Sequence, residues 1–450
     1  MNNLKIGFGR VNVNPPMGIG IAGYYKTRLA EGVLDDLEIN AMAVSDGKTT
    51  AVVIAVDHCG INQKVIAELK ASVVKATGLD EDAVYISATH THTGPYLELD
   101  SESELEREYY TFFSRRIADV AQFAFDDLKP AKMGWGIGEA PNIAFVRRFR
   151  MKDGSVKTNP GVDNPDIVAP IGDVDERVSV LRFDREGAET IVFVNFANHP
   201  DVVGGNLISA DWCGLLRKDV EKILDNTKCI FVNGMQGDVN HVNVHPTGGF
   251  LNGMFMDFDD VARGYAHAEY LARVVTGGVL QAYDKVKYVN VDSVGFVKRV
   301  INVPANLPKP EDMPKAKEIN DLHNAGRDDE IPFKGMMLTT VVAEAARMVR
   351  LENGPESFEM NLSGIRIGDV ALIGLPGEPF TGIGRAFKAT DDWELVIPTC
   401  LTNGSEGYFP MQDAYDEGGY EARSSSFKAG VAEYLIEEGK TLLNSLKNKK

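Results

Sequence analysis

Short apolar runs recur along this chain and alternate with segments in which apolar residues return every three or four positions. The runs predict buried strands, and several are apolar throughout, which is typical of strands covered on both faces. The clearest examples are Thr50–Val56, Ala83–Ser87, Thr190–Phe196, Cys229–Val232 and Asp369–Leu375.

Helical periodicity appears between these runs. The segment 62–77 places Ile66, Leu69, Val73 and Val74 on one stripe, as expected of a helix that packs on a sheet. The same pattern predicts helices over Tyr109–Leu128, Leu215–Leu224, Val261–Ala282, Val341–Leu351 and Ser426–Leu446. Together the two kinds of segment predict an α/β fold with a mixed β-sheet core flanked by helices.

The pattern is weakest over residues 302–333, which are rich in proline and charge. We interpret this segment as a surface excursion, partly helical around Lys315–His323, and not as a linker between domains. The glycine-rich stretch Gly248–Phe255 predicts a mobile loop. No internal repeat is found, and residues 1–450 are expected to form a single large catalytic domain.

Charge and composition narrow the functional classes. A net charge of −18 disfavours nucleic acid as a partner, and the absence of a run of about 18 apolar residues predicts no membrane span. The four cysteines are far apart and form no CxxC pair, which is typical of reduced thiols. The first residues show no apolar signal-peptide core, so we expect a cytoplasmic protein.

The most informative polar feature is the pair His90 and His92, directly after the predicted strand 83–87. Residues i and i+2 of a strand share a face, so both imidazoles are expected to point into the same space. Gly94-Pro95 then turns the chain. Such a pair begins a metal site or an acid/base pair.

Four further segments place a polar side chain in a tight turn, and three of them directly follow an apolar strand. The side chains are His199, Asp238, Glu378 and Tyr408. Imidazole nitrogens and carboxylate oxygens are standard zinc ligands, and loops at strand ends are where α/β proteins place their sites. The sequence has neither the HExxH nor the HxHxDH pattern of other metal hydrolases.

Each of these side chains also has a structural interpretation. His199 could be a histidine with a purely structural role, either in a cap or in the core. Glu378 could cap a helix that begins at Pro379. Asp238 could close an Asx-turn, and Tyr408 could contribute only to packing. From the residues alone these alternatives stay open.

Read in order, the segments resemble the neutral/alkaline (non-lysosomal) ceramidase family, in its N-terminal catalytic domain. The resemblance runs from the N-terminal part to near Phe427. Its motifs are Ser87–Pro95, Asn198-His199-Pro200 with Ser209-Ala210-Asp211, Gly237-Asp238-Val239, Pro376-Gly377-Glu378, and Gly407-Tyr408 with Tyr420-Glu421. Each motif is short, but the ordered set is specific.

The resemblance implies one Zn²⁺ per chain, held by His90, His199, Glu378 and Tyr408. It also implies that His92 assists catalysis, and that Tyr420 and an arginine bind the substrate carbonyl. Arg147 is favoured over Arg148 for this last role. Where the family has a serine after Gly-Asp-Val, this chain has Asn240, so a serine nucleophile is excluded at that position.

We therefore expect a zinc-dependent hydrolase that uses a metal-activated water to cleave a carbonyl bond, and an N-acyl amide is the favoured substrate. Lactone, ester or other small-metabolite hydrolysis would use the same groups, and a metabolite-binding protein with a relic zinc site is the alternative from another class. Asp201 or Asp211 is expected to hold the distal nitrogen of a ligand histidine. Specificity is expected from Tyr96–Asp100 and from the loop 248–258.

Overall fold

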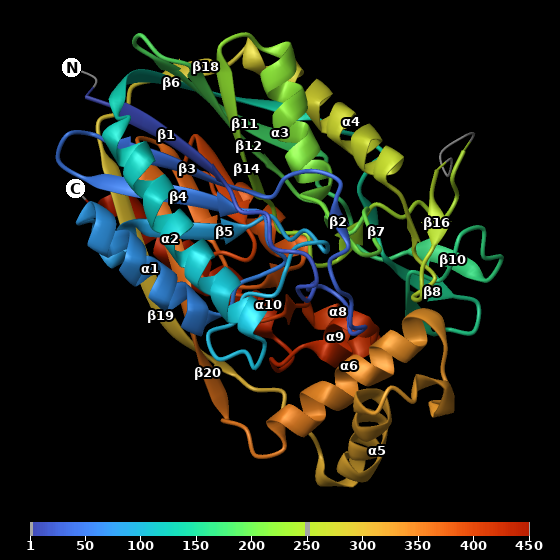
Figure 1. The fold of residues 1–450 in the computed structure, drawn as a ribbon. Coiled ribbons are helices and arrows are strands. Elements are labelled where there is room, and N and C mark those ends of the chain that lie inside the picture. Colours follow the sequence, from blue (N-terminus) through green and yellow to red (C-terminus); the bar gives the residue numbers. More distant parts are fainter. Residues whose placement is uncertain (1–2, 248–252, 450) are drawn as a thin grey trace.

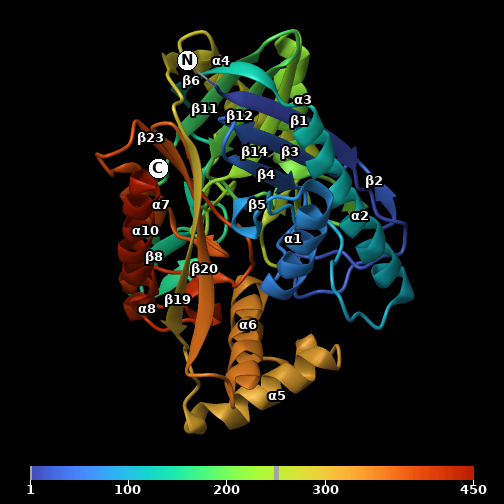
Figure 2. The ribbon, with the colours of Figure 1, turned by 90° about the vertical axis from the view of Figure 1, so that its left-hand side faces the viewer.

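In the computed structural model, which describes residues 3–247 and 253–449, two β-sheets pack face to face between layers of helices (Figures 1 and 2). The larger sheet has nine strands in the order β14-β12-β11-β6-β1-β3-β4-β5, with β18 also paired to β6. Its strands are β1 (Lys5–Asn12), β3 (Glu38–Ser45), β4 (Thr50–Val56), β5 (Val84–Ala88), β6 (Lys129–Glu139), β11 (Arg177–Arg185), β12 (Thr190–Phe196), β14 (Thr227–Asn233) and β18 (Lys287–Val289).

The smaller sheet has the order β19-β20-β21-β23. Its strands are β19 (Val294–Pro304), β20 (Ser357–Ile367), β21 (Val370–Gly374) and β23 (Leu395–Thr399). Most pairs in the two sheets are antiparallel, but β4–β5, β12–β14 and β21–β23 are parallel. The sheets are therefore mixed, as the sequence predicts.

The helices have the following bounds: α1 (Gln63–Thr77), α2 (Glu104–Asp126), α3 (Asp211–Ile223), α4 (Tyr265–Tyr283), α5 (Met313–Asn324), α6 (Gly335–Leu351), α7 (Thr381–Lys388), α8 (Gln412–Glu417), α9 (Tyr420–Ser424) and α10 (Val431–Asn448). Helices α1 to α4 cover the outer face of the large sheet, and α7 and α10 cover the outer face of the small one. Figure 2 shows the two sheets between α7 and α10 on one side and α1 and α2 on the other. None of the helices among the described residues is both long and apolar enough to cross a bilayer.

The layers explain why several strands lack polar alternation. In β4, Val52 and Ile54 pack under α1 and α2, whereas Val53 packs between the two sheets. In β21, Leu372 lies between the sheets and Ile373 faces the outer helices. Both faces of these strands are covered, so both faces are apolar.

The predicted strands and helices are present, with shifted ends. Helix α2 begins at Glu104 and not at Tyr109, because Ser103 caps its first turn by accepting the backbone N–H of Glu106. Helix α3 begins at Asp211, before the predicted Leu215, whereas α10 begins at Val431, after the predicted Ser426. The polar cap of α2 lies outside its apolar stripe, so hydrophobic periodicity does not register it, whereas at α10 the left-handed Gly430 (φ 93°) directly before Val431 marks where the helix begins.

The excursion 302–333 contains α5, close to the predicted helical part, and two short 3-10 turns, η2 (Pro310–Asp312) and η3 (Asp328–Glu330). Helix α5 packs on α6 through a small apolar cluster that includes Ile319 and Val341. Figure 1 shows this helix pair projecting beyond the sheets, with α6 beside α9. The predicted mobile loop falls partly on residues 248–252, outside the described residues.

Short strand pairs shape the loops. These are β2 (Gly32–Val33) with β13 (Leu207–Ile208), β7 (Phe145–Val146) with β15 (Val239–Asn240), β16 (Phe255–Met256) with β17 (Ala262–Arg263), β22 (Glu378–Pro379) with β24 (Tyr408–Phe409), and β8 (Arg148–Met151) between β9 (Val156–Thr158) and β10 (Ile167–Pro170). The carboxyl ends of β5, β12, β14 and β21 all lead into loops that carry residues predicted for the site.

Candidate metal centre and active site

His90 and His92 converge, but not because they share a strand. Strand β5 ends at Ala88, and His90 lies in a turn with a φ of 77°. This left-handed conformation is uncommon for a residue with a side chain and is typical of functional sites. The turn places the Nε2 atoms of the two imidazoles 3.2 Å apart. The predicted convergence is therefore correct, and the predicted strand geometry behind it is wrong.

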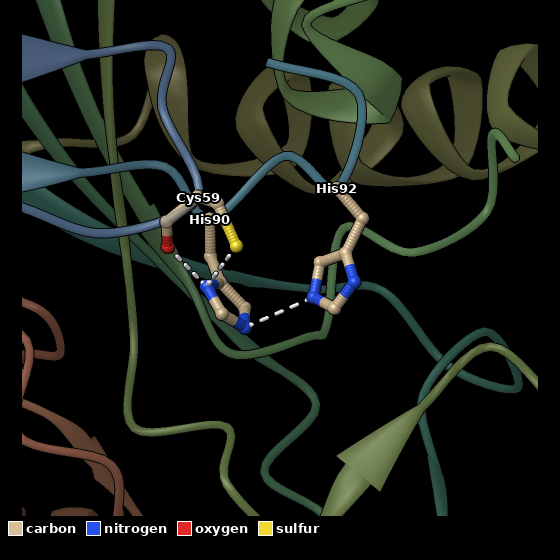
Figure 3. A group of neighbouring side chains, drawn as sticks. All are labelled: Cys59, His90 and His92. Carbon is tan, nitrogen blue, oxygen red and sulfur yellow. Dashed lines mark hydrogen bonds between the residues drawn. The ribbon is translucent and has the colours of Figure 1, made fainter. Parts of the chain in front are cut away.

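The loop after β4 holds the other edge of His90. His90 Nδ1 contacts the carbonyl oxygen of Cys59, and the Cys59 thiol lies 3.8 Å from the same nitrogen (Figure 3). A carbonyl partner at Nδ1 leaves Nε2 with a free lone pair for a metal. The prediction that Asp201 or Asp211 holds the distal nitrogen of a ligand histidine is wrong for His90.

His199 brings a second imidazole from the loop after β12, with its Nε2 3.0 Å from His90 Nε2. Its Nδ1 is buried and has no hydrogen-bond partner among the described residues. One side chain ties the two histidine loops together: the Asn233 amide donates to the carbonyls of Thr89 and Asn198, at 3.1 and 3.0 Å. Each carbonyl belongs to the residue just before a histidine.

Glu378 completes this group, with Oε2 3.2 Å from His90 Nε2 and 3.8 Å from His199 Nε2. Its backbone is held by the pairing of β22 with β24, in which Glu378 stands opposite Tyr408. Glu378 does not cap a helix, because α7 begins at Thr381 with Phe380 at its N-cap. The pairing brings the predicted glutamate and tyrosine to one place.

The Gly237-Asp238 motif packs against the loop that carries Glu378. Both Asp238 oxygens accept hydrogen bonds from Thr381, one from its backbone N–H at 2.7 Å and one from its hydroxyl at 3.0 Å. A Cβ on Gly237 would lie 2.3 Å from the Glu378 carbonyl oxygen, so only glycine permits this approach. Asp238 therefore anchors the turn that carries Glu378 and does not serve as a local Asx-turn.

The residues fit a zinc ion. Neighbouring ligands of a tetrahedral zinc with bonds of about 2.0–2.1 Å lie about 3.3 Å apart, and the separations of 3.0, 3.2 and 3.8 Å among His90, His199 and Glu378 bracket this value. Glu378 Oε2 is buried with no hydrogen-bond partner in the described part of the chain. A cation at this point would satisfy all three groups, since their lone pairs converge there.

Charge at the centre follows from burial and mutual contact. Burial opposes charge on each group, but the Glu378 carboxylate raises the pKa of His90 above its usual value. Burial alone would raise the pKa of the Glu378 carboxyl, but the attraction of His90 outweighs burial and helps lower this pKa to about 2. Burial lowers the pKa of His199 well below its usual value, and the neighbouring His90 adds to this. The centre therefore holds an ionised carboxylate beside imidazoles, a donor set suited to a divalent cation.

Tyr408, Tyr420 and Arg147 lie together beside this centre. The two tyrosine rings meet edge to face at 5.5 Å, and the Arg147 guanidinium carbon lies 5.2 Å from the Tyr408 ring and 6.0 Å from the Tyr420 ring. Arg147 is fixed by hydrogen bonds to Glu421 at 2.6 Å and to the Gly237 carbonyl at 2.7 Å. Arg148 instead pairs with Glu417 at 3.2 Å and lies over Phe380.

His92 stands next to the zinc-ligand group. Among the described residues, one group of candidate ligand atoms within 4.8 Å of one another contains His90, His199 and Glu378, and a second contains His92 with His90 and Cys59. On its other side, His92 Nδ1 lies 3.6 Å from Asp201 Oδ1. Asp201 is in turn held by the Tyr24 hydroxyl at 2.5 Å and by Arg263 at 2.6 Å.

Both aspartates proposed as partners of a ligand histidine have other roles. Asp201 lies 3.6 Å from His92 Nδ1, beyond hydrogen-bond distance, and is hydrogen-bonded to Tyr24 and Arg263. Asp211 accepts the backbone N–H groups of Val202 and Val203, at 2.9 and 2.8 Å, and so shapes the loop after His199. Asn240, which replaces the serine of the family motif, is buried and donates to Asn159 at 2.9 Å.

A cavity of about 610 Å³ opens onto His90, His92 and Glu378. Tyr408 and Tyr420 also line it, and Tyr96, from one of the segments predicted to set specificity, forms part of its wall. The loop 248–258 lies partly outside the described residues, but Phe258 lines a narrower space on the other side of His92 and His199.

The sequence did not reveal several residues at this site. Tyr24 and Arg263 support Asp201, and Cys59 contacts His90. Helix α6 supplies a further wall of the cavity through Ala343, Ala346, Arg347 and Arg350. The only sequence signal for α6 was its apolar stripe, which reports the buried face and says nothing about the face that meets the cavity.

Comparison with known proteins agrees with this architecture. No protein-family model matches the chain. The crystal structure of neutral ceramidase from Pseudomonas aeruginosa is similar with a TM-score of 0.72 and 17% sequence identity, over 99% of this chain and 75% of that one. A ceramidase complexed with C2 is similar with a TM-score of 0.72 and 16% identity, over 99% and 76%. The chain therefore has the neutral ceramidase fold over almost its whole length.

Proposed function

We propose that this protein is a zinc-dependent hydrolase that cleaves the carbon–nitrogen bond of an N-acyl amide. The observation that carries the proposal is the convergence of His90, His199 and Glu378 within 3.8 Å, beside a cavity that His90 and Glu378 line, on the fold of neutral ceramidase. Tyr408 would be the fourth ligand. Bound zinc would supply a Lewis acid and lower the pKa of a coordinated water toward about 7.

The surrounding side chains have separate tasks. His92 Nε2 faces the metal group and is placed to accept a proton there and return it to the departing nitrogen. Asp201, held by Tyr24 and Arg263, lies 3.6 Å from Nδ1 of this imidazole, and its negative charge would favour the protonated form of His92. Arg147 and Tyr420 would donate hydrogen bonds to the substrate oxygen as it gains negative charge, and loss of one such donor typically costs about 10²–10³ in kcat.

The experiment is a substrate panel measured on zinc-loaded protein, with soluble N-acyl amines, a short-chain ceramide, lactones and esters. We expect hydrolysis of N-acyl amides, and we expect His92→Ala to abolish turnover while the protein keeps its zinc. If the protein hydrolyses lactones or esters but no amide, it is a lactonase or esterase and not an amidase. A protein that binds one zinc but turns over nothing would instead be a binding protein with a relic site.

A further inference from the structure

The wall that α6 contributes to the cavity is positively charged. Arg347 and Arg350 lie three residues apart on this helix, so they share one face, and both line the cavity that ends at Glu378 and Tyr408. Ala343 and Ala346 line it beside them.

Arg347 is a buried cation that no carboxylate of the described residues contacts, although Glu344 on the same helix lies near enough to interact with it electrostatically. Its exposed fraction is 4%, and it donates to two backbone carbonyls, Arg423 O at 2.9 Å and Asn306 O at 2.6 Å. No carboxylate of the described residues lies within 4.0 Å of its nitrogens. Burial lowers its pKa below the usual value for arginine, which is the expected response to a buried charge that is only partly compensated.

Arg350 is exposed at the cavity and, among the described residues, also has no carboxylate in contact, although Glu406 interacts with it electrostatically. Its Nη2 donates to the Ser426 hydroxyl at 2.7 Å, and within the described ranges no acid lies within 4.0 Å of it. Glu406 lines the same cavity but lies beyond that distance. By contrast, Arg423 on the neighbouring α9 is paired with Glu344 of α6 at 2.5 Å. In a chain of net charge −18, two unpaired arginines in one cavity point to a ligand that supplies the negative charge.

Resting on the hydrolase function above, we propose that the substrate is an acyl amide carrying an anionic group, which Arg350 and Arg347 bind while the amide carbonyl lies at the metal centre. The planar guanidinium fork pairs with two oxygens at once, a geometry that carboxylates and phosphates share. A neutral ceramide would leave both arginines unpaired. The favoured class is therefore an N-acyl amino acid or an N-acyl aminoalkyl phosphate.

The test compares substrates that share one acyl chain and differ only in charge: an N-acyl amino acid, its neutral carboxamide, and an N-acyl aminoalkyl phosphate. We expect wild-type kcat/KM to favour at least one anionic member over the carboxamide by about tenfold or more. Loss of a charged hydrogen-bond partner is expected to cost about 10- to 100-fold, so Arg350→Gln should lower this ratio by that factor. Arg350→Lys should restore part of it.

Arg327→Gln is the matched control, because Arg327 lies in the excursion 302–333 that precedes α6, pairs with Glu330 and does not line the cavity. Its ratio should equal that of the wild type. A wild-type ratio near one, or an Arg350→Gln ratio equal to that of the wild type, would overturn the anion proposal and leave the hydrolase function intact. Preference for the carboxylate or for the phosphate decides between the two anions.

Binding separates this proposal from the hydrolase assignment. Calorimetry with the N-acyl amino acid and the N-acyl aminoalkyl phosphate on His92→Ala protein should show binding that Arg350→Gln weakens by about 10- to 100-fold. If this holds while the wild type hydrolyses nothing, the anion site stands and the proposed function fails. If neither anionic amide binds more tightly than the carboxamide, the anion site is absent.

Discussion

Glu378 and Tyr408 stand opposite each other in a two-residue parallel pairing, and the Glu378 N–H donates to the carbonyl of Gly407 at 2.8 Å. This short ladder fixes the backbone of two side chains from different loops. Its position follows from the parallel pairing of β21 with β23, because both strands end at the same edge of the small sheet. The glutamate and the tyrosine therefore reach the histidines of the large sheet as one unit.

Zinc binding is the first prediction. Wild-type protein should bind one zinc per chain, and His90→Ala and Glu378→Ala should each lose zinc on dialysis, because each variant removes one ligand of the set. Metal analysis of the dialysed proteins checks this. His323→Ala is the control, since His323 lies on α5 and contacts Asp328 at 2.8 Å. Retention of a full zinc by both ligand variants would show that the assigned centre is wrong.

Asn233 is expected to hold the two histidine loops together. In Asn233→Asp, a carboxylate replaces the amide that donates to the carbonyls of Thr89 and Asn198. Buried oxygens would then face one another without a proton between them, so we expect a loss of at least about 2 kcal/mol in the free energy of unfolding together with weaker zinc binding. Urea denaturation and metal titration measure both. The exposed Asn444→Asp should behave like the wild type.

Gly237 tests the close packing beneath Glu378. An alanine there would place its Cβ 2.3 Å from the Glu378 carbonyl oxygen, and such overpacking typically costs about 1–3 kcal/mol. We expect Gly237→Ala to be less stable and to bind zinc less tightly, because the glutamate loop must shift. In Gly277→Ala, by contrast, the new methyl group meets open space on α4. That variant should be as stable as the wild type or gain up to about 1 kcal/mol, as thermal denaturation would show.

Asp175 gives a prediction for stability against pH. Burial alone would raise its pKa, but Arg177 and Lys388 outweigh this and lower the pKa to about 2, below the ordinary value of 3.8. A lowered pKa stabilises the fold above the ordinary value, and this stabilisation is lost as the pH falls through about 2. The shift corresponds to about 2 kcal/mol.

Asp175→Asn should therefore lower the free energy of unfolding by about 2 kcal/mol at pH 7, and its difference from the wild type should shrink from pH 4 to pH 2. Urea denaturation across this range is the measurement. The side chain of Asp284 is 87% exposed, so Asp284→Asn should match the wild type throughout. A difference that stayed constant with pH would contradict the ion-pair explanation, because a packing defect does not titrate.

The sequence by itself determined the elements and the candidate ligands. Apolar runs such as 50–56 and 190–196 are strands with the predicted bounds, because a strand buried on both faces has no polar position to blur its limits. His90, His199 and Glu378 were identifiable because each is a polar side chain in a turn near an apolar strand. These signals depend only on neighbouring residues, so they can be recognised from the sequence alone.

Only the tertiary structure decided how these residues meet. The left-handed turn at His90, the Asn233 bridge between two loops and the face-to-face packing of two sheets all depend on contacts between distant segments. The same holds for Arg347 and Arg350, which read as ordinary charges on a helix until α6 is placed against the cavity. Hydrophobic pattern specifies which face of an element is buried, but what the polar face meets is set by the packing of the whole chain.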